Sequence, residues 1–375
     1  MAKVHPAARA EDALNAVVAR RLRKRGWQRQ VLPYIGYAGD GFARVLARVV
    51  LGRDGQPTTA PSAEEAPIRR GFKVFFTAPL ADVDVVVRFG AASTTATTDR
   101  GGYLDVELGE HGLDAGWHAA QISVGDLTVE APVQVISPET RFGIISDVDD
   151  TCLVTALPRP MIAAWNSFVL EETARKVVPG MPAMYRSLLA AHPGAPIIYL
   201  STGAWNTHPI LTRFLRRHGF PSGPALLTDW GPTDDSIFRS GQAHKRESLR
   251  RLAAAFPHIQ WLLVGDDGQH DPVIYEDFAV EHPDNVACIA IRQLTVAQQL
   301  LSHGHPLVRD ELRGRPRPGR RAADQWDQAT DTTMRNESSR LARMMVCEGP
   351  DGFTLHRLVR RALTDFGSAR SEADA

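Results

Sequence analysis

The chain has 375 residues, with 43 Lys and Arg balanced by 43 Asp and Glu, so a polyanionic partner such as nucleic acid is not expected. This length exceeds one ordinary domain, and the hydrophobic fraction of 43% is typical of folded soluble proteins. No stretch approaches the ~20 apolar residues that span a bilayer, and residues 1–27 lack the apolar centre of a signal peptide, so we expect a cytoplasmic protein.

The N-terminal 30 residues are predicted to contain a basic amphipathic helix over residues 11–25. One face carries Leu14, Val17, Val18 and Leu22. The other face carries Arg20, Arg21, Arg23, Lys24 and Arg25. Such a helix either packs on its own protein, which is the commoner case, or lies on an anionic membrane surface. Peripheral membrane contact therefore stays open.

Residues 31–137 change to short β-like runs separated by Gly, Asp and Pro, which is typical of a small antiparallel β-sandwich. The segment 56–67, rich in Pro, Thr, Ala and Glu, is predicted to be a long loop. The ligand of this domain is not indicated by any pattern in it. The expected strands are Ala43–Leu51, Phe72–Thr77, Val83–Phe89, Leu104–Leu108, His118–Val124 and Thr128–Val135.

Residues 138–304 alternate buried strands with helical patterns, which predicts an α/β domain with a doubly wound parallel sheet. In such a sheet, ligands bind beyond the carboxyl ends of the strands. Residues 305–375 are expected to form a partly ordered helical extension, with helices at 324–345 and 354–366. The expected strands are Phe142–Ser146, Ile197–Ser201, Ala225–Thr228, Trp261–Gly265 and Ala287–Ile291, with helices at His208–His218 and Glu247–Phe256.

The cysteines Cys152, Cys288 and Cys347 are far apart in the sequence and form no CxxC pair. Neither a disulfide framework nor a thiolate zinc site is therefore expected.

Two acids follow the first strand of the α/β domain. Asp147 and Asp149 are two residues apart, so both carboxylates are expected at the sheet edge. One carboxylate can attack phosphorus, and the other can donate a proton to the leaving oxygen and then activate water. Acid clusters also occur in ordinary loops and calcium sites, although the pattern does not fit an EF-hand loop.

Polar residues also follow the later strands. Ser201, Thr202 and Gly203 end the second strand, where a hydroxyl and backbone N–H groups can bind phosphate or simply cap a turn. Lys245 stands just ahead of the next predicted helix, where an ammonium can stabilise phosphoryl oxygens or lie in solvent.

A second acid group follows the fourth strand. Asp266, Asp267 and Asp271 are predicted to face the first acid pair across the sheet edge, or to form a polar turn only. An oxygen-rich site of this kind suits Mg²⁺. We therefore expect magnesium as the cofactor.

The ordered set resembles the haloacid dehalogenase superfamily of phosphotransferases in its DxDxT form. Asp147, Asp149 and Thr151 match the first motif, and Ser201, Lys245 and Asp266–Asp267 match the next three. The block Gly265–Tyr275 is similar to the actin-patch-associated phosphatidate phosphatase family, as are Ile145–Thr151, Tyr199–Ser201, His244-Lys245, Tyr34–Tyr37 and the strand Val45–Leu51. The resemblance extends over about residues 30–300.

The resemblance implies a Mg²⁺-dependent phosphomonoester hydrolase with phosphatidate as its expected substrate. Asp147 would be the nucleophile that forms an aspartyl-phosphate and Asp149 the acid–base group. Ser201, Thr202, Gly203, Thr151 and the catalytic Lys245 would contact phosphate. Asp147, the backbone carbonyl of Asp149 and Asp266 would hold the metal, with Asp267 or Asp271 in support.

Two departures from the family pattern matter. The second motif reads Ser201–Asn206 where relatives continue with serines and a proline, and Asp267 stands where relatives carry Ser. Either Asp267 or Asp271 therefore completes the metal site.

The region 153–178 is expected to form a small cap, which leaves the site open to a bulky ester.

Two alternatives remain open at this stage. The chain is either a phosphatase of soluble, protein or nucleic-acid phosphoesters, or a non-catalytic interaction protein. The oligomeric state is not indicated.

Overall fold

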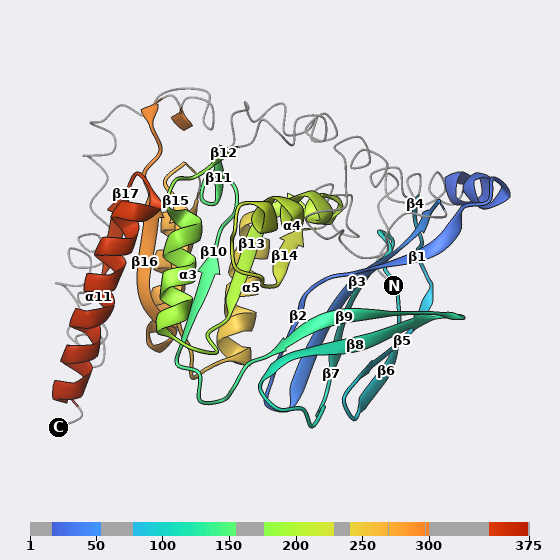
Figure 1. Cartoon of the computed structure of the whole chain (residues 1–375), viewed down its shortest axis with the longest axis horizontal. Helices are drawn as coiled ribbons and strands as arrows, with labels where there is room; N and C mark the ends of the chain where they lie inside the picture. The colour runs from blue at the N-terminus through green and yellow to red at the C-terminus, as the bar shows by residue number, and fades with distance from the viewer. Residues whose placement is uncertain are drawn as a thin grey trace, which may run out of the picture. The chain divides into compact units, whose positions relative to one another are not determined.

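The computed structural model describes residues 17–53, 78–154, 176–228, 241–268, 270–296, 298–299 and 345–373 (Figure 1). The chain divides into two compact units. The first, here called the β unit, comprises Met1–Thr140, Ser201–Arg217 and Ser222–His244. The second, here called the α/β unit, comprises Arg141–Leu200, His218–Pro221 and Lys245–Ala375.

The β unit begins, in its described part, with a helix over residues 17–24. Ala19 is buried in the core of the unit and Leu22 packs against that core. Val17 and Val18 are 46% and 38% exposed. The predicted apolar face is therefore partly wrong, because the packed face is centred on Ala19 rather than on the two valines. Leu14 lies outside the described residues.

The strands of the β unit pair mainly antiparallel, and all nine belong to one hydrogen-bonded sheet. Only the β2–β9 pair is parallel among the described pairings of this sheet. The path runs β1-β3-β2-β9-β8-β5-β6, with β4 and β7 paired to β3. Its two-layer packing as a sandwich stays a prediction. The strands are β1 (Gln28–Pro33), β2 (Gly36–Gly39), β3 (Phe42–Gly52), β4 (Ala78–Pro79), β5 (Asp84–Phe89), β6 (Ala92–Thr97), β7 (Tyr103–Leu108), β8 (Gly116–Val124) and β9 (Leu127–Val135).

Alternating burial along these strands explains which of them the sequence revealed. In β5, Val85, Val87 and Phe89 are buried while the residues between them are exposed or half-buried. β6 has the same period with small polar residues and no fully buried position, so it lacked the apolar alternation that marks a strand. β1 and β2 were also not predicted. The predicted strand Phe72–Thr77 and the loop 56–67 lie outside the described residues.

The second sheet is parallel wherever its pairings are described, as predicted. Its order is β14-β13-β10-β15-β16-β17, and β10, at its centre, is buried at every residue. Buried parallel strands read as continuous apolar runs, which is why they were recognised. β13 passes from the α/β unit into the β unit, to which β14 belongs. The strands are β10 (Phe142–Ser146), β13 (Ile197–Ala204), β14 (Ala225–Thr228), β15 (Gln260–Asp266), β16 (Val286–Arg292) and β17 (Val346–Gly349).

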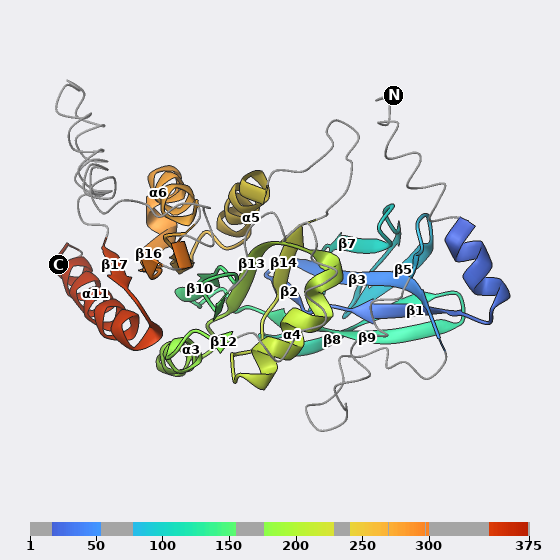
Figure 2. The same ribbon diagram turned by 90° about the horizontal axis from the view of Figure 1, so that it is seen from above.

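Helices cover both faces of the sheet in the α/β unit. Figure 2 shows α3 (Met181–Ala191) and α11 (Gly352–Ala373) on one side and α5 (Gly241–Ala255) and α6 (Asp271–Glu281) on the other. β11 (Leu153–Val154) and β12 (Lys176–Val177), which lie at the two ends of the predicted cap region, pair antiparallel. Most of that cap, including Met161–Val169, lies outside the described residues. No described helix is long and apolar enough to cross a membrane.

The C-terminal segment contributes to this same sheet. We predicted that the phosphatase domain ends at residue 304, but β17 pairs parallel with β16, and α11 packs on both strands. A four-residue edge strand gives almost no sequence signal, which explains the difference. The helix predicted at 354–366 is present within α11, whereas most of the one at 324–345 lies outside the described residues.

Cys288 and Cys347 are brought together by this pairing. Their Sγ atoms are 3.6 Å apart, and both thiols are free. Their separation in the sequence therefore did not indicate that the two thiols are neighbours in the fold.

Candidate active site

The first acid of the site follows β10, which lies between β13 and β15. The N–H of Asp147 donates to the Val264 carbonyl at 2.8 Å, which continues the β10–β15 pairing by one residue. The chain then turns sharply, and the N–H of Cys152 donates to the Val148 carbonyl at 2.8 Å. Asp150 occupies the left-handed region with φ 57°. Asp147 is 1% exposed and fixed at the strand end.

Lys245 lies beside this nucleophile candidate. It was expected just ahead of a helix, but α5 begins at Gly241 and places Lys245 on its buried face. Its Nζ donates to Asp147 Oδ1 at 2.6 Å and to Asp271 Oδ1 at 2.5 Å. Burial alone would lower the pKa of Lys245, but the two carboxylates outweigh it and raise the pKa above its ordinary value. The ammonium therefore stays charged.

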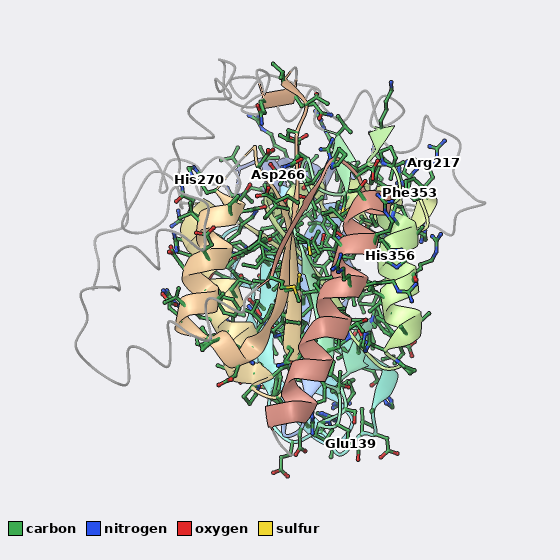
Figure 3. All side chains as sticks on the ribbon, turned by 90° about the vertical axis from the view of Figure 1, so that its left-hand side faces the viewer. Glu139, Arg217, Asp266, His270, Phe353 and His356 are labelled. Carbon is green, nitrogen blue, oxygen red and sulfur yellow. The ribbon has the colours of Figure 1, made fainter. Side chains whose placement is uncertain are left out.

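The carboxylates of Asp266, at the end of β15, and Asp271, at the start of α6, lie close to that of Asp147. The N–H of Gly268 donates to Asp266 Oδ1 at 2.7 Å. A Cβ at Gly265 would lie 2.6 Å from Asp271 Oδ2, so this glycine makes room for the carboxylate. Figure 3 labels Asp266, the last residue of β15, and His270, which precedes the first residue of α6.

Carboxylate oxygens of Asp147, Asp266 and Asp271 lie within 4.8 Å of one another. The Oδ2 atom of each is buried and has no hydrogen-bond partner. Unpaired buried oxygens of this kind are costly unless a cation or proton satisfies them. The three acids and their spacing therefore fit a hard divalent cation such as Mg²⁺.

The electrostatics of the group point the same way. Burial raises the pKa of Asp147, the positive charge of Lys245 lowers it, and the charges of Asp271 and Asp149 raise it again. The net result is a pKa well above the ordinary value. The pKa of Asp266 is raised by burial and by the carboxylates of Asp271 and Asp147. Among the described residues, the Lys245 ammonium thus contacts two of the three clustered carboxylates.

Asp267 does not join this group, although it is adjacent to Asp266. Its Oδ1 accepts from the N–H of Leu294 at 2.8 Å and its Oδ2 accepts from Gln299 Nε2 at 3.4 Å. Between the two alternatives left open by the sequence, the geometry favours Asp271. The difference arises at the turn after β15, whose side-chain directions no spacing rule specifies.

Asp149 and Thr151 flank the left-handed residue of the loop after β10. Asp149 is half-buried and forms an isolated β-bridge with Leu153. Thr151 is fully buried, and its Oγ1 has no hydrogen-bond partner. Both lie in the α/β unit, and the charge of Asp149 acts on Asp147.

Ser201, Thr202 and Gly203 belong to the β unit, so their distance from the acids stays a prediction. Ser201 Oγ accepts from the N–H of Gly203 at 2.9 Å. The Thr202 carbonyl accepts from Thr228 Oγ1 at 2.8 Å. The hydroxyl and the turn are thus formed as expected, whereas their role in binding phosphate is not tested by these contacts.

The side chains of Ser146 and Tyr185 support the backbone of Asp147, and no pattern in the sequence predicted this. Ser146 Oγ donates to the Asp147 carbonyl at 2.7 Å and lies 2.6 Å from the Tyr185 hydroxyl. Both residues are buried. Ser146 could have been noticed because it precedes the nucleophile candidate, but no motif marks Tyr185, which comes from α3.

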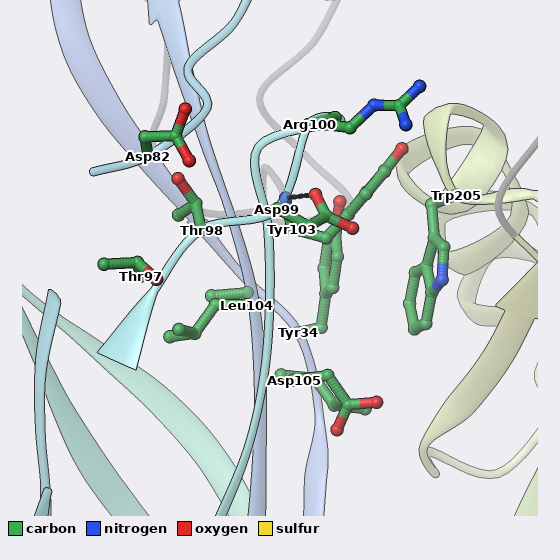
Figure 4. Close-up of a pocket in the computed structure, with 12 residues that line it drawn as sticks. Tyr34, Asp82, Thr97, Thr98, Asp99, Arg100, Tyr103, Leu104, Asp105 and Trp205 are labelled. Carbon is green, nitrogen blue, oxygen red and sulfur yellow. Dashed lines mark hydrogen bonds between the residues drawn. The ribbon is translucent and has the colours of Figure 1, made fainter. Parts of the chain in front are cut away.

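A separate cavity of about 480 Å³ lies in the β unit (Figure 4). Tyr34, Tyr103 and Trp205 line it, and the Tyr34 and Trp205 rings stack with centroids 5.1 Å apart. The N–H of Tyr103 donates to Asp99 Oδ1 at 2.7 Å at its rim. None of the four clustered residues of the acid site lines this cavity.

Residues 142–293 match the family model described as phosphatidate phosphatase APP1, catalytic domain. Over 164 residues the chain is 28% identical to phosphatidate phosphatase APP1 of Saccharomyces cerevisiae, covering 43% of this chain and 27% of the yeast protein. It is 24% identical over 172 residues to an uncharacterized protein of Schizosaccharomyces pombe, covering 45% of this chain and 28% of that protein. The chain thus spans about a quarter of the length of these curated relatives.

Among solved structures, the HAD domain of effector protein Lem4 from Legionella pneumophila aligns with a TM-score of 0.28 and 12% identity, covering 51% of this chain and 98% of that domain. A carbohydrate acetylesterase from Xanthomonas citri aligns with a TM-score of 0.27 and 10% identity, covering 75% of this chain and 77% of that one. Scores this low carry no argument about fold or function.

Proposed function

Residues 142–293 belong to the phosphatidate phosphatase APP1 catalytic-domain family, and from this premise and the geometry of the acids we propose that the protein is a Mg²⁺-dependent phosphomonoester hydrolase. One observation carries the proposal. A buried lysine bridges two carboxylates at the carboxyl ends of parallel strands, and three buried carboxylate oxygens there lack any partner.

In this proposal Asp147, Asp266 and Asp271 would hold the metal, which would offset the negative charge of the phosphoryl oxygens. A carboxylate oxygen of Asp147 attacks phosphorus in line, the bond from phosphorus to the ester oxygen breaks, and an aspartyl-phosphate forms. Lys245 favours the ionised form of Asp147, against the effect of burial, and orients this carboxylate through its 2.6 Å contact.

Asp149 serves as the acid and base. Protonated at first, it gives its proton to the departing alkoxide, and then takes a proton from the water that hydrolyses the aspartyl-phosphate. The products are an alcohol and inorganic phosphate. Ser201, Thr202, Gly203 and Thr151 are proposed to contact the phosphoryl oxygens, so catalysis consists mainly of positioning and charge stabilisation.

Phosphatidate is the proposed natural substrate, because the yeast relative is a phosphatidate phosphatase. The exposed basic residues after Val18 on the N-terminal helix support access to an anionic surface. This part of the proposal is separate from the hydrolytic chemistry and is tested by a different substrate.

The test uses the purified full chain with p-nitrophenyl phosphate and with phosphatidate in mixed micelles, each with Mg²⁺ and with chelator. We expect Mg²⁺-dependent release of phosphate from both substrates. Hydrolysis of the aryl ester alone would overturn the lipid assignment and favour a soluble or protein phosphoester. Hydrolysis of neither would contradict the proposed function.

Asp147→Asn tests the nucleophile. We expect activity below about one thousandth of wild type, since an amide cannot form the covalent intermediate. Asp277→Asn is the matched control, because Asp277 is exposed on α6 and pairs only with Arg246 among the ion pairs described for it. Substantial turnover by pure Asp147→Asn protein would exclude the nucleophilic role of Asp147.

A further inference from the structure

Arg292 is a buried cation that none of the motifs explains. It is the last residue of β16 and is only 4% exposed. A buried guanidinium is retained only where its donors have partners, because a buried unpaired charge is strongly destabilising. Its partners therefore indicate what it does.

The three nitrogen atoms of the Arg292 guanidinium donate to three different segments of the α/β unit. Nη1 donates to the Asp150 carbonyl, Nη2 donates to Gln298 Oε1 at 3.0 Å, and Nε donates to the Pro350 carbonyl at 3.4 Å. Arg292 thus joins the loop after β10 to residue 298 and to the residue that follows β17. The planar fork of arginine suits such a three-way contact, whereas the single ammonium of lysine does not.

The contact with Asp150 falls at the most constrained point of the loop. Asp150 has φ 57°, a conformation that a non-glycine residue adopts at a cost and keeps only where its surroundings impose it. It stands between Asp149 and Thr151, so its backbone sets the direction in which both neighbours point. Holding its carbonyl therefore constrains the proposed acid–base group.

The charges around Arg292 agree with this role. Burial lowers its pKa, while the carboxylates of Asp150 and Asp266 act in the opposite direction. The guanidinium thus adds positive charge near the loop and near the end of β15.

We propose that Arg292 is a positioning residue for the loop of the nucleophile: by holding the Asp150 carbonyl it fixes Asp149 for proton transfer to the leaving group. This inference rests on the proposed function. A purely structural tie between β16 and β17 would instead affect all substrates equally, because it would not act on one step of the reaction.

The test exploits the different need of two esters for a proton. An aryl oxide leaves readily without one, whereas an alkoxide does not. We measure kcat of the full chain and of Arg292→Lys for p-nitrophenyl phosphate and for a short alkyl phosphate. We expect the alkyl kcat to fall about tenfold more than the aryl kcat. Asp149→Asn, which removes the proposed acid itself, should change the two values in the same direction.

Arg250→Lys is the matched control. Arg250 is half-exposed on α5 and makes a bidentate pair with Glu281, outside the site. Its ratio of alkyl to aryl kcat should equal that of wild type. Gln298→Ala, which removes only one partner of Arg292, is measured alongside and should shift the ratio in the same direction to a smaller extent.

Equal losses for the two esters in Arg292→Lys would overturn the inference and leave Arg292 with a structural role. If that variant does not fold, as judged by circular dichroism, an unchanged ratio in Gln298→Ala overturns it equally. Failure of the proposed function looks different, because the wild-type chain would then hydrolyse neither ester.

Discussion

At the scale of single residues, the site is dominated by an excess of buried negative charge. Asp147, Asp266 and Asp271 are each at most 1% exposed, and Lys245 is the cation that contacts two of them. Like charges at this separation repel strongly where water is excluded. The acids are therefore expected to reduce the stability of the metal-free protein, as groups selected for function often do.

The variant Asp266→Asn tests whether repulsion among the acids lowers the stability of the metal-free protein. The amide keeps the shape and can still accept the N–H of Gly268, but one charge is removed. We expect the metal-free variant to unfold about 2–4 °C higher than wild type, which corresponds to about 1 kcal/mol for a domain of this size. We also expect Mg²⁺ to raise the Tm of the wild-type protein, and the same variant should lose this rise. Differential scanning fluorimetry with chelator and with Mg²⁺ measures both. A lower metal-free Tm would contradict the repulsion argument.

Asp271→Asn and Asp267→Asn form a matched pair, since both remove one carboxylate close to the end of β15, that of Asp271 buried and that of Asp267 half-buried. Asp271 has an unpartnered Oδ2 within the acid group, whereas both oxygens of Asp267 accept hydrogen bonds from Leu294 and Gln299. We expect Asp271→Asn to raise the Mg²⁺ concentration for half-maximal thermal stabilisation about tenfold or more, and Asp267→Asn to leave it within about twofold. The reverse pattern would assign the metal ligand to Asp267.

At the scale of elements, the site depends on the close approach of α6 to the end of β15. A Cβ on Gly265 would lie 2.6 Å from Asp271 Oδ2 and 2.8 Å from the Tyr275 ring. Gly265→Ala must therefore displace the first turn of α6. We expect a loss of about 1–3 kcal/mol in the free energy of unfolding and weaker Mg²⁺ binding, because the carboxylate of the proposed ligand Asp271 would be displaced.

The control for this variant is Gly109→Ala, since a Cβ at Gly109 meets no atom within 4 Å. Chemical denaturation should leave its stability within about 0.5 kcal/mol of wild type. If Gly265→Ala were as stable as Gly109→Ala and bound Mg²⁺ normally, the close approach of Asp271 would not matter.

The same two elements show what the sequence could and could not predict. The buried runs of β10 and β15 identified neighbouring parallel strands, and the strand-end rule then placed Asp147 and Asp266 together. The choice of Asp271 over Asp267 depends on how the chain turns after β15, which residue spacing does not specify. Lys245 was placed before its helix because the first turn of α5 is polar and lacks an apolar period.

Arg292 and Tyr185 could not be predicted to support the site, since neither belongs to a motif. Their partners are mainly backbone or hydroxyl groups, and these contacts exist only after the strands pair. β17 was missed for a related reason, because residue 289 meets residue 346 only through long-range pairing. Sequence patterns thus reveal buried strands and the acids at their ends, whereas the residues that orient those acids depend on tertiary structure.

At the scale of the whole molecule, the proposed lipid substrate raises the question of how the protein would reach it, since no described helix can cross a membrane. The helix over residues 17–24 packs through Ala19 and Leu22, which leaves Val17 and Val18 exposed beside the basic side chains. This arrangement leaves the basic side chains accessible to an anionic surface without unfolding the helix.

Replacing the exposed basic residues by Gln tests this arrangement without disturbing Ala19 and Leu22. The variant changes Arg20, Arg21, Arg23, Lys24 and Arg25, all of which are exposed. Each cation near an anionic surface contributes about 1 kcal/mol of binding free energy. The affinity for phosphatidate-containing vesicles at low salt, measured by co-sedimentation, should therefore fall at least about a hundredfold. Hydrolysis of p-nitrophenyl phosphate should not change, because none of these residues belongs to the acid site.

The control is Arg88→Gln, which alters one exposed arginine on β5 and should leave vesicle binding within about twofold of wild type. Wild-type binding should also fall at high salt, since salt screens exposed charges beyond about 10 Å at 0.1 M. If wild-type protein hydrolyses the soluble ester rapidly but does not bind anionic vesicles even at low salt, the lipid assignment is wrong. A soluble phosphate ester would then be the better substrate, because the chemistry of Asp147 and Lys245 does not require a membrane.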